Sequence, residues 1–237
     1  MQRGLTTGAI RVRFFPDYRE SNPYQSLRYD NLGADIAASP IEGVADFAQG
    51  QWQRDADILH LHWEAAPFIR DEMTPEAFLD RLSVFQAQGG TIVWTIHNIA
   101  PHDTRHLAAA EAVRLGLLQL ADILHLHSLA ALAAVRREGW PAAPAKLRII
   151  PHGNYDGAYP IFTQAAARAA LGLDTAGQVV LLPGQIRDYK APAELARAFL
   201  EVAGPKDRLL LRGHLASDVD AATLPEDERV VAVFGFA

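Results

Sequence analysis

The chain has no cysteine among its 237 residues. Disulfide bonds and thiolate metal sites are therefore excluded. A basic excess is missing too, because 22 Lys and Arg residues stand against 28 Asp and Glu, a formal net charge of −6. General nucleic-acid-binding proteins usually carry a basic excess, so no nucleic-acid partner is expected.

Long hydrophobic runs are also absent. No apolar stretch approaches the roughly 20 residues that cross a bilayer, and the first ten residues lack the apolar segment of a signal peptide. We therefore expect a cytoplasmic protein, and peripheral contact with the inner face of the membrane stays open. Hydrophobic residues make up 49% of the chain and charged residues 21%, which predicts a folded core. The abundance of Ala, Leu and Arg is typical of a bacterial source.

One heptapeptide occurs twice, because Ala56–His62 and Ala121–His127 share the sequence ADILHLH. Each copy predicts a strand of a parallel sheet, with Ala-Asp closing the preceding turn and the histidines near the carboxyl end. Open α/β sheets bind ligands at that edge. We expect one histidine of each pair to pack internally and the other, His62 or His127, to face a cleft.

The two histidine pairs also allow a metal site. Residues i and i+2 of a strand face the same side of a sheet, so either pair could bind one ion in a metal-dependent hydrolase. However, Asp57 and Asp122 fall at the wrong ends of their strands, and Glu64 is the only acid close to a pair. We therefore expect no metal and keep the hydrolase as an alternative.

Predicted strands and helices alternate along the chain, which is typical of βαβ units and a parallel sheet. Strands are expected at Ile10–Phe15, Asp57–Trp63, Thr91–Ile96, Asp122–His127, Lys146–Ile150, Gln178–Leu182, Arg208–Arg212 and Arg229–Phe234. Helices are expected at Pro23–Ala38, Thr74–Gly89, Thr104–Gln119, Ser128–Glu138, Ala165–Leu171 and Pro192–Val202. A break in the alternation predicts one domain over residues 1–160 and a second, partial domain over 161–237.

Two pairs of polar residues are candidates for a binding or catalytic site. Arg187 and Lys190 follow the first strand of the second domain and precede a helix, where a guanidinium, an ammonium and free backbone amides suit a diphosphate. The alternative is a solvated turn. His97 and Asn98 follow the most strand-like run of the first domain. A histidine there can bond a hydroxyl or shuttle a proton, or it can be a core residue bonded to a backbone carbonyl.

Other polar and aromatic residues follow predicted strands. Tyr18, Asn22 and Tyr24 could stack on and hydrogen bond to a sugar, although Asn22 also fits a helix N-cap. Trp63 could be a sugar platform or a core residue. The pair His152 and Gly153 ends the last strand of the first domain, where Gly153 can adopt positive φ and admit a ligand, or simply form a turn.

Five segments in this order resemble the motifs of GT-B glycosyltransferases: Asp57–His62, Thr95–Asn98, Ala121–Ser128, Ile150–Gly153 and Gly184–Lys190. The resemblance is strongest to the family 4 group that builds bacterial exopolysaccharide and lipopolysaccharide, and it covers nearly the whole chain. It implies an α/β protein with two Rossmann-like parallel-sheet domains facing a cleft. The first would bind the acceptor and the second the nucleotide-sugar.

The resemblance also implies a reaction. A hexose would move from a nucleoside-diphosphate sugar to a carbohydrate or lipid-linked acceptor, with retention and without a metal or other cofactor. His97 matches the family's histidine beside the donor sugar. Arg187 and Lys190 match the basic pair that holds the diphosphate, with Gln185 in the usual place of the arginine and Ala191 in that of a glycine.

The family's paired glutamates, which contact the donor sugar and ribose, have no counterpart in this sequence. The resemblance therefore implies a shortened second domain, which a second polypeptide could complete. A non-catalytic partner of a glycosyltransferase is the corresponding alternative function.

Overall fold

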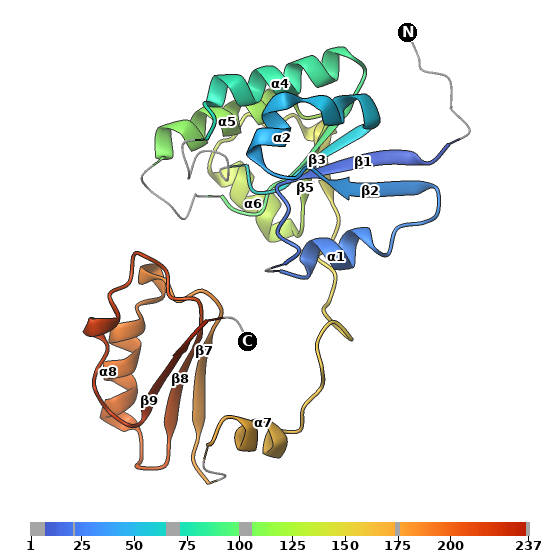
Figure 1. Ribbon diagram of the computed structural model, residues 1–237. Coiled ribbons are helices and arrows are strands. Elements are labelled where there is room, and N and C mark those ends of the chain that lie inside the picture. The colour runs from blue at the N-terminus through green and yellow to red at the C-terminus, as the bar shows by residue number, and fades with distance from the viewer. Residues whose placement is uncertain (1–7, 21, 65–71, 100–105, 174–175, 236–237) are drawn as a thin grey trace. The chain divides into compact units, whose positions relative to one another are not determined.

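The computed structural model describes residues 8–20, 22–64, 72–99, 106–173 and 176–235. The chain forms two compact units, Met1–Tyr159 and Pro160–Ala237. Each unit contains one sheet, and every strand pair within the two sheets is parallel (Figure 1). The predicted α/β class is therefore confirmed.

The first unit has a six-stranded sheet in the order β2-β1-β3-β4-β5-β6. Its strands are β1 (Ile10–Phe15), β2 (Ile36–Pro40), β3 (Ile58–Leu61), β4 (Thr91–Thr95), β5 (Ile123–Leu126) and β6 (Leu147–Ile149). Its helices are α1 (Tyr24–Tyr29), α2 (Val44–Gln49), α4 (Pro75–Ala87), α5 (Leu107–Leu120) and α6 (Leu129–Arg137), with short 3₁₀ turns η1 (Gln51–Asp55) and η2 (Pro144–Lys146).

The two faces of this sheet differ because side chains alternate along each strand. One face carries Leu59, Leu61 and Trp94, which join the main core with aromatic side chains of α2 and α4. On the opposite face, Tyr29 of α1 stacks on Phe14 at a ring distance of 4.1 Å. Figure 1 shows α1 and α4 on opposite sides of the sheet.

Three aspartates, called the strand-start aspartates below, have the same role at the amino ends of strands. Asp57 accepts a hydrogen bond from the Arg11 amide at 2.9 Å, and Asp122 accepts one from the Ile92 amide at 2.8 Å. In the second unit, the Asp207 carboxylate accepts from the Gln178 amide at 2.7 Å. Each carboxylate thus joins the start of one strand to its neighbour, which explains the Ala-Asp of both heptapeptides.

The helix expected at Pro23–Ala38 is wrong in length. It ends at Tyr29, and the following residues form β2, which pairs with β1 from Ile36 opposite Ile10. The polar and glycine-containing turn at 30–35 interrupts the helix, and a short segment ending in Pro40 suits only an edge strand. The sequence did not indicate α2 or η1. The first residues of the helix expected at Thr104–Gln119 lie outside the described residues.

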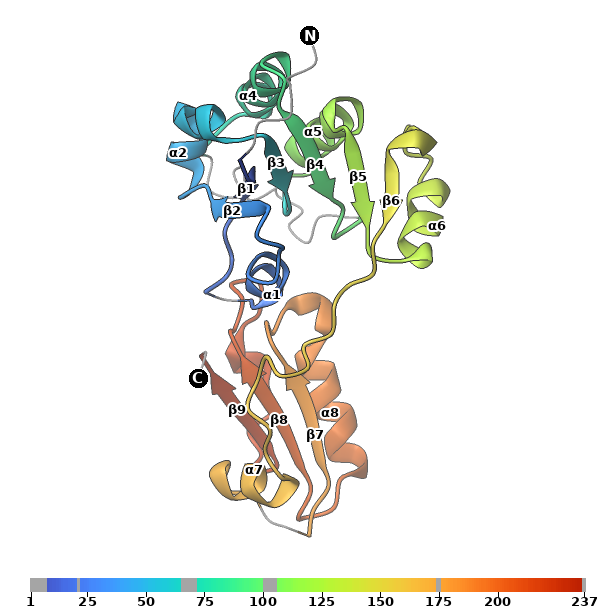
Figure 2. The same ribbon diagram turned by 90° about the vertical axis from the view of Figure 1, so that its right-hand side faces the viewer.

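The second unit has a three-stranded sheet in the order β7-β8-β9. Its elements are α7 (Gln164–Ala170), β7 (Val179–Pro183), η3 (Asp188–Lys190), α8 (Pro192–Val202), β8 (Arg208–Gly213), η4 (Ala221–Thr223) and β9 (Val230–Phe234). Ala196 and Phe199 of α8 pack with Leu209 and Leu211 of β8, and Figure 2 shows α8 running along this sheet. In the described parts of both units, no helix is long and apolar enough to span a bilayer.

Candidate functional site

Six polar side chains share one face of the first sheet, near the carboxyl ends of its central strands. They alternate with apolar residues that enter the main core on the other face. We call this set the polar face: His60, His62, Thr95, His97, His125 and His127. Helix α1 lies against it and contributes Tyr24, Arg28 and Tyr29.

The first histidine pair is buried around a tyrosine. The Tyr29 hydroxyl lies 2.8 Å from His60 Nδ1 and 2.7 Å from His62 Nε2. Both imidazoles therefore face the same side of β3, as the spacing predicts. His62 is 0% exposed, so the expectation that it faces a cleft is wrong: it is covered by α1.

The group that these two histidines share is the Tyr29 hydroxyl. Across the described residues, no group of three or more His, Cys, Asp or Glu side chains is placed to hold a metal. The structure therefore does not favour the metal-dependent hydrolase.

His97 is held from two sides. Its Nε2 lies 3.1 Å from Nδ1 of His62, and its ring stacks on Trp63 at 4.2 Å with an interplanar angle of 11°. Trp63 in turn meets the Tyr18 ring edge-on at 5.0 Å. His97 and Trp63 are both half-buried, as is Asn98, which follows His97. Trp63 thus orients the imidazole and keeps part of its own ring at the surface.

The second histidine pair continues the site. Tyr24 is almost buried, and its hydroxyl accepts a hydrogen bond from Arg28 and lies 3.2 Å from His127 Nε2. His127 is half-buried whereas His125 is buried, so only His125 of this pair is fully packed, and the cleft expected at His127 stays a prediction.

The pair at the end of the last strand lies beside this group. The exposed ring of His152 is 5.0 Å from that of Tyr24 and 5.1 Å from that of His127. Its Nδ1 hydrogen bonds to the Gly153 carbonyl at 2.6 Å. Gly153 does not adopt the positive φ expected of it.

The electrostatics of the polar face keep its histidines neutral. Burial is the largest cause and lowers the pKa of His97 to about 3 and that of His125 to about 4. Burial also lowers the pKa of His60 and His62 well below the ordinary value, and Arg28 acts in the same direction. A neutral His97 favours hydrogen bonding to a hydroxyl over proton shuttling near pH 7.

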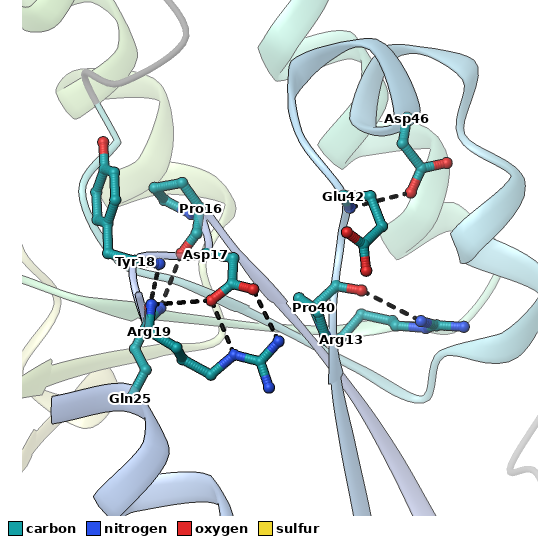
Figure 3. A network of polar contacts seen from close by, with 9 residues as sticks. All are labelled: Arg13, Pro16, Asp17, Tyr18, Arg19, Gln25, Pro40, Glu42 and Asp46. Carbon is teal, nitrogen blue, oxygen red and sulfur yellow. Dashed lines mark hydrogen bonds and ion pairs between the residues drawn. The ribbon is translucent and has the colours of Figure 1, made fainter. Parts of the chain in front are cut away.

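The loop after β1 is fixed by a residue that the sequence did not single out for this role. Gln25 is buried; its Oε1 accepts from the Tyr18 amide at 2.7 Å, and its Nε2 donates to the Pro16 carbonyl at 2.8 Å. Asp17 and Arg19 form an ion pair at 2.8 Å, and Figure 3 shows the Tyr18 ring directed away from it.

Helix capping at α1 is close to the expectation. Asn22 Oδ1 accepts from the Tyr24 amide at 2.9 Å, although the N-cap position itself is Pro23. The structure thus gives Asn22 a role in fixing the start of α1.

In the second unit, Arg187 and Lys190 lie between β7 and α8, where the sequence placed them. Arg187 Nε donates to Gln185 Oε1 at 2.8 Å, and Lys190 Nζ donates to the Pro183 carbonyl at 3.2 Å. Both side chains are half-buried, and α8 begins two residues after Lys190. The first turn of an α-helix has free amides, so these two cations directly precede in the chain a helix end that can bind an anion.

Glycines end all three strands of the second sheet. Gly184, Gly213 and Gly235 have φ values of +82°, +145° and +121°. A Cβ on Gly213 would lie 1.8 Å from the Gly184 carbonyl oxygen, whereas one on Gly235 would meet nothing within 4 Å. The backbones of the β7 and β8 ends therefore approach each other more closely than any side chain allows.

We expect Gly213→Ala to be much more damaging than Gly235→Ala. Both changes place a Cβ at positive φ, which costs about 1–3 kcal/mol, but only the first meets backbone and adds about 1–3 kcal/mol of overpacking. Urea denaturation followed by far-ultraviolet circular dichroism would measure the two free energies of unfolding. Equal losses would contradict the close approach.

Two residues that join the histidines were not predicted from the sequence. Thr95 links His60 to His125, and Tyr29 links His60 to His62. One signal was available for Thr95: it precedes His97 by two residues, so both share a face of the strand. No sequence signal placed Tyr29 over β3, because that contact depends on where α1 packs.

Comparison with known proteins gives one partial sequence match and several fold matches. No family model matches the chain. D-inositol 3-phosphate glycosyltransferase of Segniliparus rotundus is 42% identical over 76 residues. That stretch is 31% of this chain and 17% of the relative.

Solved structures are similar over almost the whole chain. Anabaena HepE, crystallised in complex with UDP-glucose, has a TM-score of 0.63 at 13% identity, covering 96% of this chain and 70% of its own. UDP-GlcNAc 2-epimerase from Neisseria meningitidis, bound to UDP-GlcNAc, has a TM-score of 0.56 at 9% identity, covering 97% and 73%. Identities this low establish similarity of fold, and the chain accordingly has an α/β fold of GT-B type.

Proposed function

We propose that this protein is a glycosyltransferase that uses a nucleoside-diphosphate sugar. The observation that carries the proposal is the cation pair Arg187 and Lys190 at the turn before α8. In transfer from a nucleotide sugar, negative charge grows on the departing diphosphate, and fixed positive groups stabilise it. Similarity of fold to HepE, whose crystal structure contains UDP-glucose, supports the same class of donor.

The two units would have different roles. The second unit would bind the donor diphosphate through Arg187, Lys190 and the first amides of α8, so the scheme needs no metal or other cofactor. The first unit would offer His97 to a hydroxyl of the donor sugar. We assign the acceptor side to residues around it: Tyr18, Asn22, Tyr24, Trp63, Asn98, His127, His152 and Gly153. Buried His62 would support His97 without touching substrate.

The finer assignment follows the sequence resemblance. The sugar would be a hexose transferred with retention, and the acceptor a carbohydrate or a lipid-linked sugar in bacterial polysaccharide synthesis. A second polypeptide could complete the donor unit, and the acceptor could bring the protein to a membrane surface.

Binding of nucleotides tests the donor site directly. We expect calorimetric titration of the full chain with UDP, GDP and ADP to find at least one diphosphate that binds. It should bind about 10–100-fold more tightly than the matching monophosphate, because the β-phosphate adds a charge-assisted contact. No binding, or equal affinity for mono- and diphosphate, would contradict the assignment of Arg187 and Lys190.

Turnover then separates the possible functions. A transferase releases nucleoside diphosphate from the nucleotide sugar as acceptor is consumed. A sugar epimerase would change the sugar without net release, which would contradict the proposal. Binding without turnover on a panel of donors and acceptors would favour the non-catalytic partner.

A further inference from the structure

We propose that Thr95 and Tyr29 are positioning residues that determine which nitrogen of His97 carries its proton. They would leave Nδ1 of His97 as a hydrogen-bond acceptor for a sugar hydroxyl. A neutral imidazole has two tautomers, and its neighbours decide between them. The nature of the ligand rests on the proposed function, whereas the tautomer is a property of the ligand-free chain.

The argument starts at His125, whose two nitrogens have partners of opposite character. Its Nε2 lies 2.9 Å from the Ile150 carbonyl oxygen, which can only accept a hydrogen bond. Its Nδ1 lies 3.5 Å from Arg28 Nη2, which can only donate. His125 is therefore neutral, with its proton on Nε2 and a lone pair on Nδ1.

Thr95 connects His125 to His60 on a neighbouring strand, and the proton position on His125 fixes the direction of both hydrogen bonds. Its hydroxyl oxygen lies 2.8 Å from the bare Nδ1 of His125, so Thr95 donates its only proton there. The same oxygen lies 2.7 Å from His60 Nε2 and must accept from it. His60 thus carries its proton on Nε2 as well.

Tyr29 connects His60 to His62 in the same way. His60 is buried, and the charges acting on it are those of Arg28 and other histidines, so a second proton is disfavoured. Its bare Nδ1 accepts from the Tyr29 hydroxyl at 2.8 Å. The Tyr29 oxygen must then accept from His62 Nε2 at 2.7 Å.

The last contact reaches His97. His62 carries its proton on Nε2, where it donates to Tyr29. Its Nδ1 is therefore bare and accepts from His97 Nε2 at 3.1 Å. Among the described residues, none hydrogen bonds to the remaining Nδ1 of His97. Stacking on Trp63 and the contact with His62 hold the ring, so this lone pair has a fixed direction. A hydroxyl group is the neutral donor that matches it.

A parallel branch gives an internal check. His127 Nδ1 lies 3.3 Å from the Ile150 carbonyl oxygen, which can only accept, so His127 carries its proton on Nδ1. Its bare Nε2 accepts from the Tyr24 hydroxyl at 3.2 Å, and the Tyr24 oxygen accepts from Arg28 Nη1 at 3.1 Å. His125 and His127, two residues apart, are thus expected to be opposite tautomers.

Imidazole nitrogen NMR of the ¹⁵N-histidine-labelled full chain tests the proposal. In the wild type we expect a proton on Nε2 of His60, His62, His97 and His125, and on Nδ1 of His127. In Thr95→Val, which lacks the hydroxyl but keeps the shape, Nε2 of His60 loses its acceptor. The proton of His60 should then move to Nδ1. The direction of every hydrogen bond from His60 to His97 reverses as a result, and the proton of His97 lies on Nδ1.

Thr95→Ser is the matched control and should keep the wild-type tautomers, because it keeps the hydroxyl. Tyr29→Phe breaks the chain at another point, and His97 should then populate both tautomers. A wild-type His97 with its proton on Nδ1 would overturn the proposal without any variant. An unchanged His97 in a folded Thr95→Val would overturn the role of Thr95.

Ligand affinity tests whether Nδ1 of His97 accepts a hydrogen bond from the sugar. Thr95→Val should weaken binding of UDP-glucose about 5-fold, the worth of one neutral hydrogen bond, and leave UDP affinity unchanged. An equal loss for both ligands would overturn the contact with the sugar. If UDP-glucose, UDP, GDP and ADP all fail to bind the wild type but the tautomers are as stated, the proposed function fails and the positioning by Thr95 and Tyr29 stands.

Discussion

Lowering the pH from 7 to 5 should remove about 4 kcal/mol from the free energy of unfolding of the first unit. Burial holds the folded-state pKa of His97 at about 3 and that of His125 at about 4, whereas unfolded histidine titrates near 6.5. Below pH 6.5 the unfolded chain therefore binds more protons, and stability falls until the folded values are reached. Each of the two histidines contributes about 2 kcal/mol at pH 5.

Other buried groups modify this loss. His60 and His62 have pKa values lowered in the same direction, chiefly by burial, and add to it. Burial raises the pKa of Glu64, which works in the opposite direction. Because single domains are usually stable by about 5–15 kcal/mol, the net effect brings the first unit close to unfolding under mild acid.

Tryptophan fluorescence during urea denaturation measures this loss. All four tryptophans belong to the first unit, so their emission reports on it alone. His97→Gln should reduce the dependence of stability on pH by about one proton, whereas His152→Gln, at an exposed position, should not. A free energy of unfolding that stays constant between pH 7 and pH 5 would show that the polar face does not exclude protons.

Lys190→Ala should weaken binding of a nucleoside diphosphate by about 1–3 kcal/mol, or about 5–150-fold in Kd. The ammonium group is bonded only weakly to the Pro183 carbonyl at 3.2 Å, so it can turn to a phosphate at little cost. Arg187 differs because its guanidinium is already bonded to Gln185 at 2.8 Å. We therefore expect Arg187→Ala to cost less than Lys190→Ala.

Lys206→Ala is the matched control for this measurement. Lys206 lies just before β8, at the opposite end of the same sheet. Calorimetric titration with the same nucleotide should give wild-type affinity for this variant. Unchanged affinity in Lys190→Ala would show that Lys190 does not contact phosphate, and equal losses in both variants would indicate only a long-range effect of charge.

Much of the architecture could be predicted from sequence because the pattern was local. The strands β1, β3, β4 and β5 begin and end within about two residues of the expectation, since in each the apolar residues recur at every second position or more often, between turn residues. The short edge strand β2 was missed because Ile36–Pro40 is neither strongly apolar nor alternating. Its pairing with β1 is a tertiary contact that a single sequence does not display.

The candidate site was predicted in outline and not in its connections. The repeated histidines and His97 could be found because strand ends in a parallel sheet meet at one edge. The burial of His62 could not, since it depends on Tyr29 reaching across from α1. Thr95 looked like an ordinary strand residue until its position opposite His125 was known.

The strand-start aspartates separate the demands of stability from those of chemistry. They clamp the amino edges of both sheets, through Asp57, Asp122 and Asp207. Strand register is thus pinned at the edge farthest from His97 and Lys190. Residues at the carboxyl edges, where the candidate site lies, can therefore change during evolution while the strand pairing at the opposite edge is kept.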